Sequence, residues 1–287
     1  MNQKFFVITF LLVGLSFYLG TKYSVNKTTP VPKTSPIVNL SQTADVLPDR
    51  VDLGISWGDV ILKMEQVGAI DKDKFLKRHP KAEKLLQSPD NNNIIVTQEN
   101  SALILNLLWP LGITNKAQVL SEGPMGTEYK DQIGNFASTG GWTLGTKDGG
   151  KLFNSQVLIK LTPEQEDLVK KIAANIYRPC CGNNTAFPDC NHGAGMLGFI
   201  ELAVASSMPE KEIYQRALAL NSYWFPQTYT ELAVFFKSKK NTSWKKIDPK
   251  EVLGESYSSG KGYGEISRQL QTEGLVPQVK SGGGCGV

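Results

Sequence analysis

The amino-acid sequence predicts a mainly α-helical globular domain with one long, irregular, glycine-rich loop, placed behind an N-terminal apolar helix. Apolar residues recur at helical spacing through 51–252, helix-capping patterns precede two of these stretches, and glycine-rich sequence with few large aliphatic residues fills 123–150. Hydrophobic residues make up 40% of the 287 residues, which excludes a fully disordered chain. The net charge of +4 gives no electrostatic basis for binding nucleic acid.

The N-terminus is typical of an export signal. Phe5–Gly20 is an uncharged apolar run, and Lys4 and the α-amino group precede it. A helix of this length rises about 24 Å, which is short of the roughly 30 Å hydrocarbon core of a membrane. No A-x-A cleavage pattern follows. We therefore expect residues 1–20 to be a signal or membrane anchor, with secretion as the outcome if the signal is cleaved.

Residues 21–50 are rich in proline and threonine and predict an extended tether. Signal, tether and domain together predict a protein that the membrane holds through its N-terminal segment, facing outside the cytoplasm. The alternative is that the apolar run is a buried helix of a cytosolic domain. Its position at the extreme terminus, followed by a proline-rich stretch, argues against that alternative.

Local signals divide the first half of the domain. Ser56–Asp59 resembles a helix start, and Asp71 is expected to cap a second helix that Pro80 interrupts. Residues 88–93 predict a loop, and 157–159 a short strand. The apolar stretch 101–109 predicts a buried helix that ends at Pro110. Trp142 is expected to anchor the glycine-rich loop on the core.

Capping patterns organise the second half. Thr162-Pro-Glu-Gln165 predicts a helix that ends at Arg178-Pro179. A further helix is expected over 193–206, and Ser207-x-x-Glu210 predicts the start of another that runs to Pro226. Residues 253–287 are expected to form a flexible glycine-rich tail.

The chemistry of the chain concentrates in one short segment. Cys180, Cys181, Cys190 and His192 form the pattern C-C-x8-C-x-H, with the first two after a predicted helix and the last two at the start of the next. Both ends of the connecting loop can therefore meet. Asp189 or Asn191 is the expected N-cap, and the helix dipole is expected to lower the pKa of Cys190.

Cysteine and histidine together are typical ligands of zinc, and adding methionine suits copper(I). The predicted ligands are Cys180, Cys181, Cys190, His192 and, from the tail, Cys285, with Met196 as a further candidate one helical turn after His192. Glu201 is expected to face away from this cluster. The other histidine, His79, lies in a charged segment and is expected to be exposed.

Two other interpretations use the same cysteines. They could serve a thiol–disulfide oxidoreductase or a thiol-dependent enzyme acting on a thiol partner, with Cys181, His192 and Asp189 as one arrangement. They could instead staple an interaction domain through disulfides, without metal. The sequence contains no C-x-x-C-H motif, so it does not indicate attached haem. It contains no Gly-Lys-Ser/Thr motif, so it does not indicate nucleotide binding.

Overall fold

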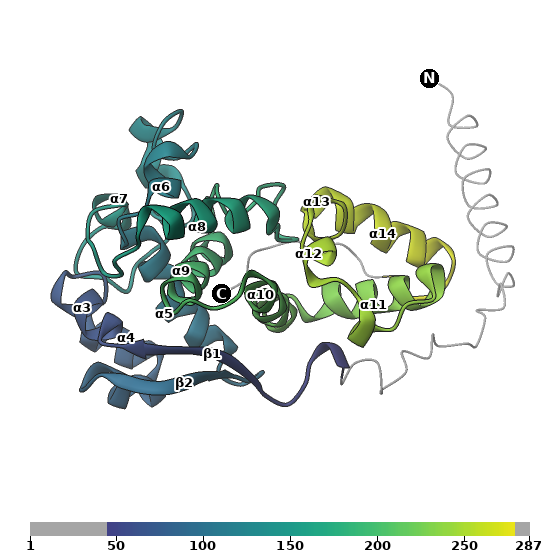
Figure 1. Cartoon of the computed structure of the whole chain (residues 1–287), viewed down its shortest axis with the longest axis horizontal. Helices are drawn as coiled ribbons and strands as arrows, with labels where there is room; N and C mark the ends of the chain where they lie inside the picture. Colours follow the sequence, from purple (N-terminus) through teal and green to yellow (C-terminus); the bar gives the residue numbers. More distant parts are fainter. Residues whose placement is uncertain (1–44, 279–287) are drawn as a thin grey trace, which may run out of the picture. The chain divides into compact units, whose positions relative to one another are not determined.

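The computed structural model describes residues 45–278 (Figure 1). The predicted anchor at 1–20, most of the predicted tether, and Cys285 lie outside this range. The described chain is mainly helical, as predicted. Its first half contains β1 (Val51–Gly58), α3 (Val60–Gln66), α4 (Lys72–Arg78), the 3-10 helix η1 (Pro80–Leu86), β2 (Asp90–Val96), α5 (Ser101–Thr114), α6 (Gln118–Glu122), the 3-10 helix η2 (Lys130–Asn135) and α7 (Gly149–Leu152).

The second half is helical in the described range. It contains α8 (Pro163–Asn175), α9 (Asn191–Ala205), α10 (Glu210–Trp224), α11 (Pro226–Lys240), the 3-10 helix η3 (Trp244–Lys246), α12 (Pro249–Val252), α13 (Glu255–Ser258) and α14 (Gly260–Thr272). Within residues 45–278, no helix combines the length and apolar character needed to cross a membrane.

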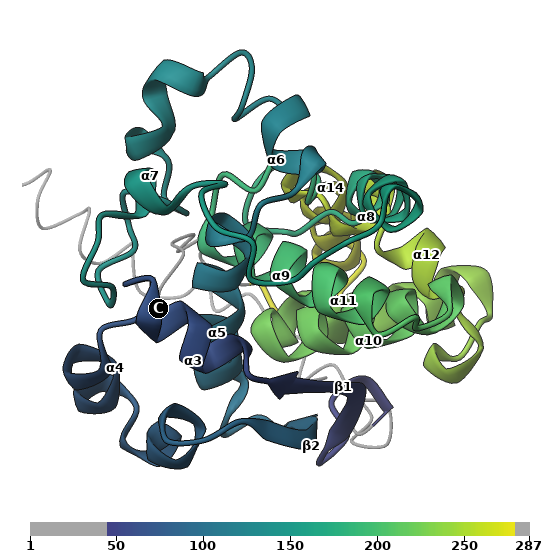
Figure 2. The same ribbon diagram turned by 60° about the vertical axis from the view of Figure 1, so that its left-hand side comes forward.

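Helices α5 and α9 lie side by side at the centre of the hydrophobic core (Figures 1 and 2). Glycines let their backbones touch. A Cβ atom at Gly112 would lie 1.9 Å from the carbonyl oxygen of Ala194, and one at Gly198 would lie 2.4 Å from that of Leu108. No side chain fits at either position, so this close helix pair depends on glycine from both helices.

Helix α5 passes through Pro110 and continues to Thr114, so the prediction that proline ends it is wrong. Proline removes one backbone donor from the helix. Every residue from Ile104 to Thr114 is buried, and this burial compensates for the lost hydrogen bond. Helix packing therefore overrides the local signal.

A two-stranded antiparallel sheet precedes α5. Strands β1 and β2 pair Val51 with Val96 and Gly58 with Asp90. The sequence predicted a helix start at 56–59, and this is confirmed in part: Asp59 is the N-cap of α3, although residues 56–58 belong to β1. The predicted loop at 88–93 is wrong for residues 90–93, which belong to β2. Gly54 and Gly58 adopt positive φ angles of 69° and 53°, beside irregularities in the pairing that the sequence pattern does not reveal.

The predicted strand at 157–159 is absent from the described fold. The backbone N–H groups of Leu158 and Ile159 instead donate to Oδ1 of Asn115, at 3.0 and 2.9 Å. The side chain of Asn115 thus replaces a neighbouring strand as the acceptor for this segment.

The glycine-rich segment 123–150 consists of turns, η2 and the first residues of α7. Trp142 is buried, and its indole Nε1 donates to the carbonyl oxygen of Ala69 at 2.8 Å. Its ring packs edge-on against Trp109, with the ring centroids 5.0 Å apart. The segment is therefore attached to the core by this tryptophan.

Two helix starts differ in their outcome. The capping box at α8 is confirmed, because the Thr162 side chain accepts from the Gln165 backbone and the Gln165 side chain accepts from the Thr162 backbone. The capping box before α10 is wrong: Pro209 is the N-cap, and Ser207 has a positive φ of 60° in the preceding turn.

Residues 253–278 do not form the flexible tail that their glycine and serine content predicts. They fold into α13 and α14, and Ile266 and Leu270 of α14 are buried in the core. The backbone N–H of Gly260 donates to the carbonyl oxygen of Cys181 at 2.7 Å. This contact connects the start of α14 to the cysteine-containing segment.

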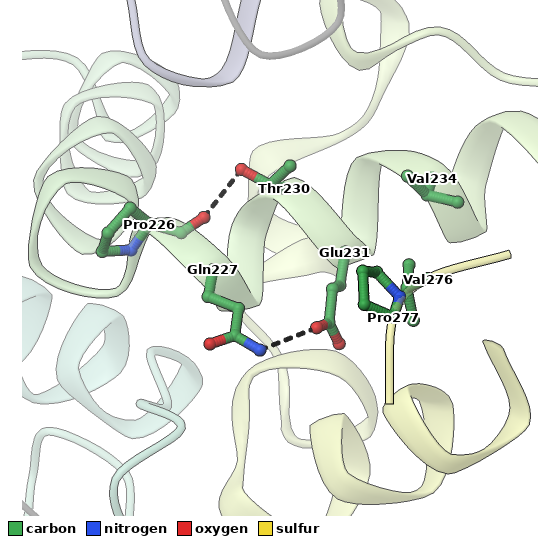
Figure 3. A pocket seen from close by; sticks show the side chains of 7 residues that line it. All are labelled: Pro226, Gln227, Thr230, Glu231, Val234, Val276 and Pro277. Atoms are coloured by element: carbon green, nitrogen blue, oxygen red, sulfur yellow. Dashed lines mark hydrogen bonds between the residues drawn. The ribbon is translucent and has the colours of Figure 1, made fainter. Parts of the chain in front are cut away.

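A separate cavity of about 360 Å³ lies beside the first turns of α11 and the segment Val276–Pro277 (Figure 3). Its one charged lining residue is Glu231, whose carboxylate accepts hydrogen bonds from Gln227 at 3.0 Å and Tyr263 at 2.9 Å. Both carboxylate oxygens therefore have donors, and the bond from Tyr263 connects α14 to α11.

Candidate metal centre

The segment between α8 and α9 folds back on itself and brings the distant cysteines together. Tyr177 and Asn184 form an isolated antiparallel bridge. Next to it, the backbone N–H and the hydroxyl of Thr185 both donate to the carbonyl oxygen of Ile176, at 2.8 and 2.9 Å. This closure is the convergence that the C-C-x8-C-x-H spacing predicts, and we call residues 178–192 the cysteine hairpin.

The cysteine hairpin forms two groups of adjacent ligand atoms. Cys180, Cys190 and His192 make up the first group, and Cys181, Asp189 and Cys190 make up the second. Within each group all ligand atoms lie within 4.8 Å of one another. Cys190 belongs to both groups. The cluster of three cysteines, His192 and Asp189 could therefore hold a metal ion.

The three described cysteines are free thiols. The Sγ atoms of Cys180 and Cys190 lie 3.6 Å apart. The Cys181 sulfur lies within 4.8 Å of the Cys190 sulfur, 3.9 Å from Oδ1 of Asp189 and 4.0 Å from the carbonyl oxygen of Asn183. Cys190 is buried, whereas Cys180 and Cys181 are half-buried. The cluster is therefore reached from the side of the two adjacent cysteines.

His192 lies in the first turn of α9 and is 7% exposed. Its imidazole packs against Phe225, with ring centroids 4.4 Å apart, and against Trp224 at 5.8 Å. These rings hold the imidazole beside Cys190. Nδ1 of His192 is buried without a hydrogen-bond partner among the described residues. A buried polar atom without a partner is costly, and metal coordination would satisfy it.

The N-cap of α9 is Cys190 itself, so the prediction of Asp189 or Asn191 as N-cap is wrong. The backbone N–H of Gly193 donates to Sγ of Cys190 at 3.4 Å. The sulfur thus occupies the position where the helix N-terminus favours negative charge. A capping thiolate is uncommon, which explains why the sequence directed the prediction to the better caps on either side.

Arg178 is the functional residue that the sequence analysis missed. Its Nε donates to Sγ of Cys190 at 3.0 Å, and its guanidinium is 2% exposed. It also forms an ion pair with Asp189. Its remaining donors bind backbone carbonyl oxygens at 3.1, 2.8 and 2.9 Å, those of Asn183, Asn184 and Phe187. The guanidinium is therefore the centre around which the cysteine hairpin closes.

The sequence contains one signal for this role. A Cβ atom at Gly193 would lie 2.6 Å from Cζ of Arg178, so the guanidinium packs directly on the backbone of α9. Gly193, Ala194 and Gly195 make the start of α9 thin, so another group can approach its backbone closely. At Gly193 the approaching group is the side chain of Arg178.

The electrostatics of the three thiols differ. Hydrogen bonds from the neighbouring Cys180 and Cys181 thiols, together with the Arg178 charge, lower the pKa of Cys190 well below its ordinary value. The predicted direction is confirmed, although the first causes are the two thiols. Contacts with the neighbouring thiols and burial raise the pKa of Cys180. Cys190 is therefore the cysteine of the three whose thiolate Arg178 favours most.

Two opposing effects act on the pKa of Cys181. Its contact with the Cys180 thiol lowers the pKa, whereas the contact with Cys190 and burial raise it by more, to about 11. Asp189 is held by Arg178 and by Asn183, whose Nδ2 donates to Oδ2 at 3.0 Å. The second ligand group is thus already partly engaged in hydrogen bonds within the cysteine hairpin.

The other candidate residues lie elsewhere. Met196 is buried in the hydrophobic core. Glu201 lies outside both ligand groups and accepts from Asn115 at 3.1 Å. His79 is half-buried rather than exposed, and its Nε2 lies 2.8 Å from Nδ2 of Asn106. Cys285 is outside the described residues.

Comparisons with protein-family models, with curated proteins and with solved structures found no match to this chain. The functional argument therefore rests on the geometry of the cysteine hairpin.

Proposed function

We propose that the cysteine hairpin binds a soft transition-metal ion through Cys180, Cys190 and His192. The observation that carries this proposal is the convergence of two sulfurs with a buried imidazole whose Nδ1 has no described hydrogen-bond partner. A disulfide staple or a packing cluster requires no imidazole. A metal ion would use all three groups at once.

The spacing of the sulfurs supports this proposal. Two thiolates bound tetrahedrally to zinc at about 2.3 Å lie roughly 3.8 Å apart. The Cys180 and Cys190 sulfurs are 3.6 Å apart, so the pair requires little rearrangement. Arg178 would then bind the metal-bound Cys190 sulfur from outside the coordination sphere and offset its charge.

The donor set favours zinc, with copper(I) as the other candidate. Thiolate and imidazole are the usual protein ligands of zinc, and Met196, the donor that would favour copper, is packed in the core. Three protein ligands leave a fourth position. Cys181, Asp189 and, from outside the described residues, Cys285 are the candidates for it.

Titration of the reduced full-length protein with Zn²⁺ or Cu⁺, in competition with a chromophoric chelator, tests this function. One ion should bind per chain. Cys180→Ser, Cys190→Ser and His192→Gln should each weaken binding by at least about tenfold, since each removes a ligand. His79→Gln is the matched control because it alters the only other histidine in the chain. Equal affinity in all four variants would contradict the proposal.

The proposed setting is the outer face of a membrane, with residues 1–20 as the anchor and 21–50 as the tether. The support comes from the uncharged run Phe5–Gly20 and the proline-rich sequence after it. The full-length protein should enter the membrane fraction, and added protease should degrade its domain in intact spheroplasts. Recovery of the intact protein in the soluble cytosol would contradict this location.

A further inference from the structure

The Cys180–Cys190 pair suits a second chemistry. We infer that these two thiols form a reversible redox pair that low-molecular-weight disulfides oxidise to an intramolecular disulfide. The inference rests on the proposed function where it concerns metal release, because the same two sulfurs are the proposed ligands. The formation of the disulfide itself does not require metal.

The geometry selects this pair. The two Sγ atoms lie 3.6 Å apart, and a disulfide bond is about 2.05 Å long, so closure requires the sulfurs to approach by about 1.5 Å. The neighbouring backbone is held in place. The carbonyl oxygen of Cys181 accepts from the backbone N–H of Gly260, and Cys190 is the N-cap of α9. Rotation of the half-buried Cys180 side chain is the expected movement.

The other pairings within the cysteine hairpin are disfavoured. Cys180 and Cys181 are adjacent in sequence, and a disulfide between neighbours closes a strained eight-membered ring. The Cys181 sulfur also lies within 4.8 Å of the Cys190 sulfur, but it contacts Oδ1 of Asp189 and the carbonyl oxygen of Asn183. Joining it to Cys190 would break both contacts.

Exposure sets the order of the reaction. Cys180 is half-buried and Cys190 is 6% exposed, so an external disulfide RS–SR reaches Cys180 first. The Cys180 thiol gives up its proton as its sulfur attacks one sulfur of RS–SR, forms a mixed disulfide and releases RS⁻. The Cys190 thiolate, beside Arg178, then attacks the Cys180 sulfur and releases the second RS⁻. The two cysteines lose two electrons in total and the external disulfide gains them, and each released RS⁻ takes up a proton from the Cys180 thiol or from water.

Oxidation and metal binding exclude each other in this arrangement. A sulfur bound in a disulfide is no longer a thiolate ligand, and the oxidised hairpin keeps only His192 from the first ligand group. Bound metal, in turn, would block attack by Cys180. The hairpin thus has a reduced, metal-binding form and an oxidised, metal-free form.

Disulfide mapping tests the inference directly. The reduced, chelator-treated full-length protein is equilibrated with oxidised glutathione, and the free thiols are alkylated before tandem mass spectrometry. Two of the four thiols should be lost, with a fragment that joins Cys180 to Cys190. Cys181→Ser and Cys285→Ser should keep this linkage, and Cys180→Ser and Cys190→Ser should lose it. Prior loading with Zn²⁺ should slow its formation.

Persistence of all four thiols, or a linkage through Cys181 or Cys285, would overturn the inference. Zn²⁺ titration of the reduced and oxidised forms separates it from the proposed function. Zn²⁺ binding to the reduced form, together with loss of that binding on oxidation, supports both the proposed function and the redox pair. Oxidation without any zinc binding by the reduced form would remove the proposed function and leave the redox pair. Zinc binding by the reduced form without disulfide formation would support the proposed function and overturn the redox pair.

Discussion

Nε of Arg178 lies 3.0 Å from Sγ of Cys190, and both residues are almost completely buried, at 2% and 6% exposure. A buried guanidinium is costly unless it is paired and hydrogen-bonded. Here the thiolate and the carboxylate of Asp189 provide the charge, and three carbonyl oxygens of the cysteine hairpin provide the remaining bonds. The same side chain therefore holds the loop closed and stabilises the thiolate.

Replacing Arg178 is expected both to open the cysteine hairpin and to remove the stabilisation of the Cys190 thiolate. Arg178→Lys keeps the positive charge but loses the planar set of five donors, so several carbonyl oxygens lose their partner. We expect the free energy of unfolding to fall by about 3 kcal/mol, measured by urea denaturation. Arg268→Lys, on the exposed side of α14, is the control and should be neutral. Equal stability of both variants would contradict the role of Arg178.

Gly193 should tolerate no side chain. The Cβ atom of Gly193→Ala would lie 2.6 Å from Cζ of Arg178 and displace the guanidinium. Zinc affinity, measured by chelator competition, should fall by about tenfold because Arg178 no longer donates to the Cys190 sulfur. Gly264→Ala is the matched control, since its Cβ meets nothing within 4 Å. That variant should keep full affinity and gain up to about 1 kcal/mol in stability.

Gly198 provides a test of the α5–α9 contact that is independent of the metal. Gly198→Ala places a Cβ atom 2.4 Å from the carbonyl oxygen of Leu108, and this backbone cannot rotate away. We expect the free energy of unfolding to fall by about 3 kcal/mol, in thermal or urea unfolding monitored by circular dichroism. An unchanged midpoint would mean that the two helices are farther apart than described.

Glu201 should make the stability pH-dependent. Burial raises its pKa well above the ordinary value, although the hydrogen bond from Asn115 partly opposes this. Its Oε1 has no described partner. A raised folded-state pKa means that the protonated group contributes full stability below about pH 4.5. That contribution is lost as the pH rises through the folded pKa, by up to about 1.4 kcal/mol per pH unit.

Glu201→Gln should remove this dependence. The variant should be more stable than the wild type at pH 8, and the difference should shrink toward pH 4, in urea titrations across this range. Glu212→Gln, on the exposed side of α10, controls for the loss of one negative charge. A wild-type advantage at pH 8 would show that the carboxylate has a charged partner.

Sequence patterns predicted the elements whose signals are local. The capping box at Thr162 and the buried helix at 101–109 depend on neighbouring residues, and both are present. The convergence of Cys180, Cys190 and His192 also followed from their spacing. Each of these features is determined within about a dozen residues of chain.

Other features depend on distant contacts. Pro110 remains helical because α9 and other core elements bury α5. The NNN stretch in β2 forms a strand because β1 is paired with it, although asparagine favours turns. Arg178 precedes a proline and therefore resembles a helix end. Its partners come together only when the cysteine hairpin closes, so no local pattern reveals them.

The central claim is that two cysteine sulfurs and one imidazole of the cysteine hairpin hold a single metal ion. X-ray absorption of the zinc-loaded, reduced full-length protein measures these ligands directly. The account predicts at least two sulfur neighbours at about 2.3 Å and one nitrogen at about 2.0 Å, with the nitrogen contribution lost in His192→Gln. A coordination shell of oxygen and nitrogen alone, or a spectrum that Cys180→Ser and Cys190→Ser leave unchanged, would contradict it.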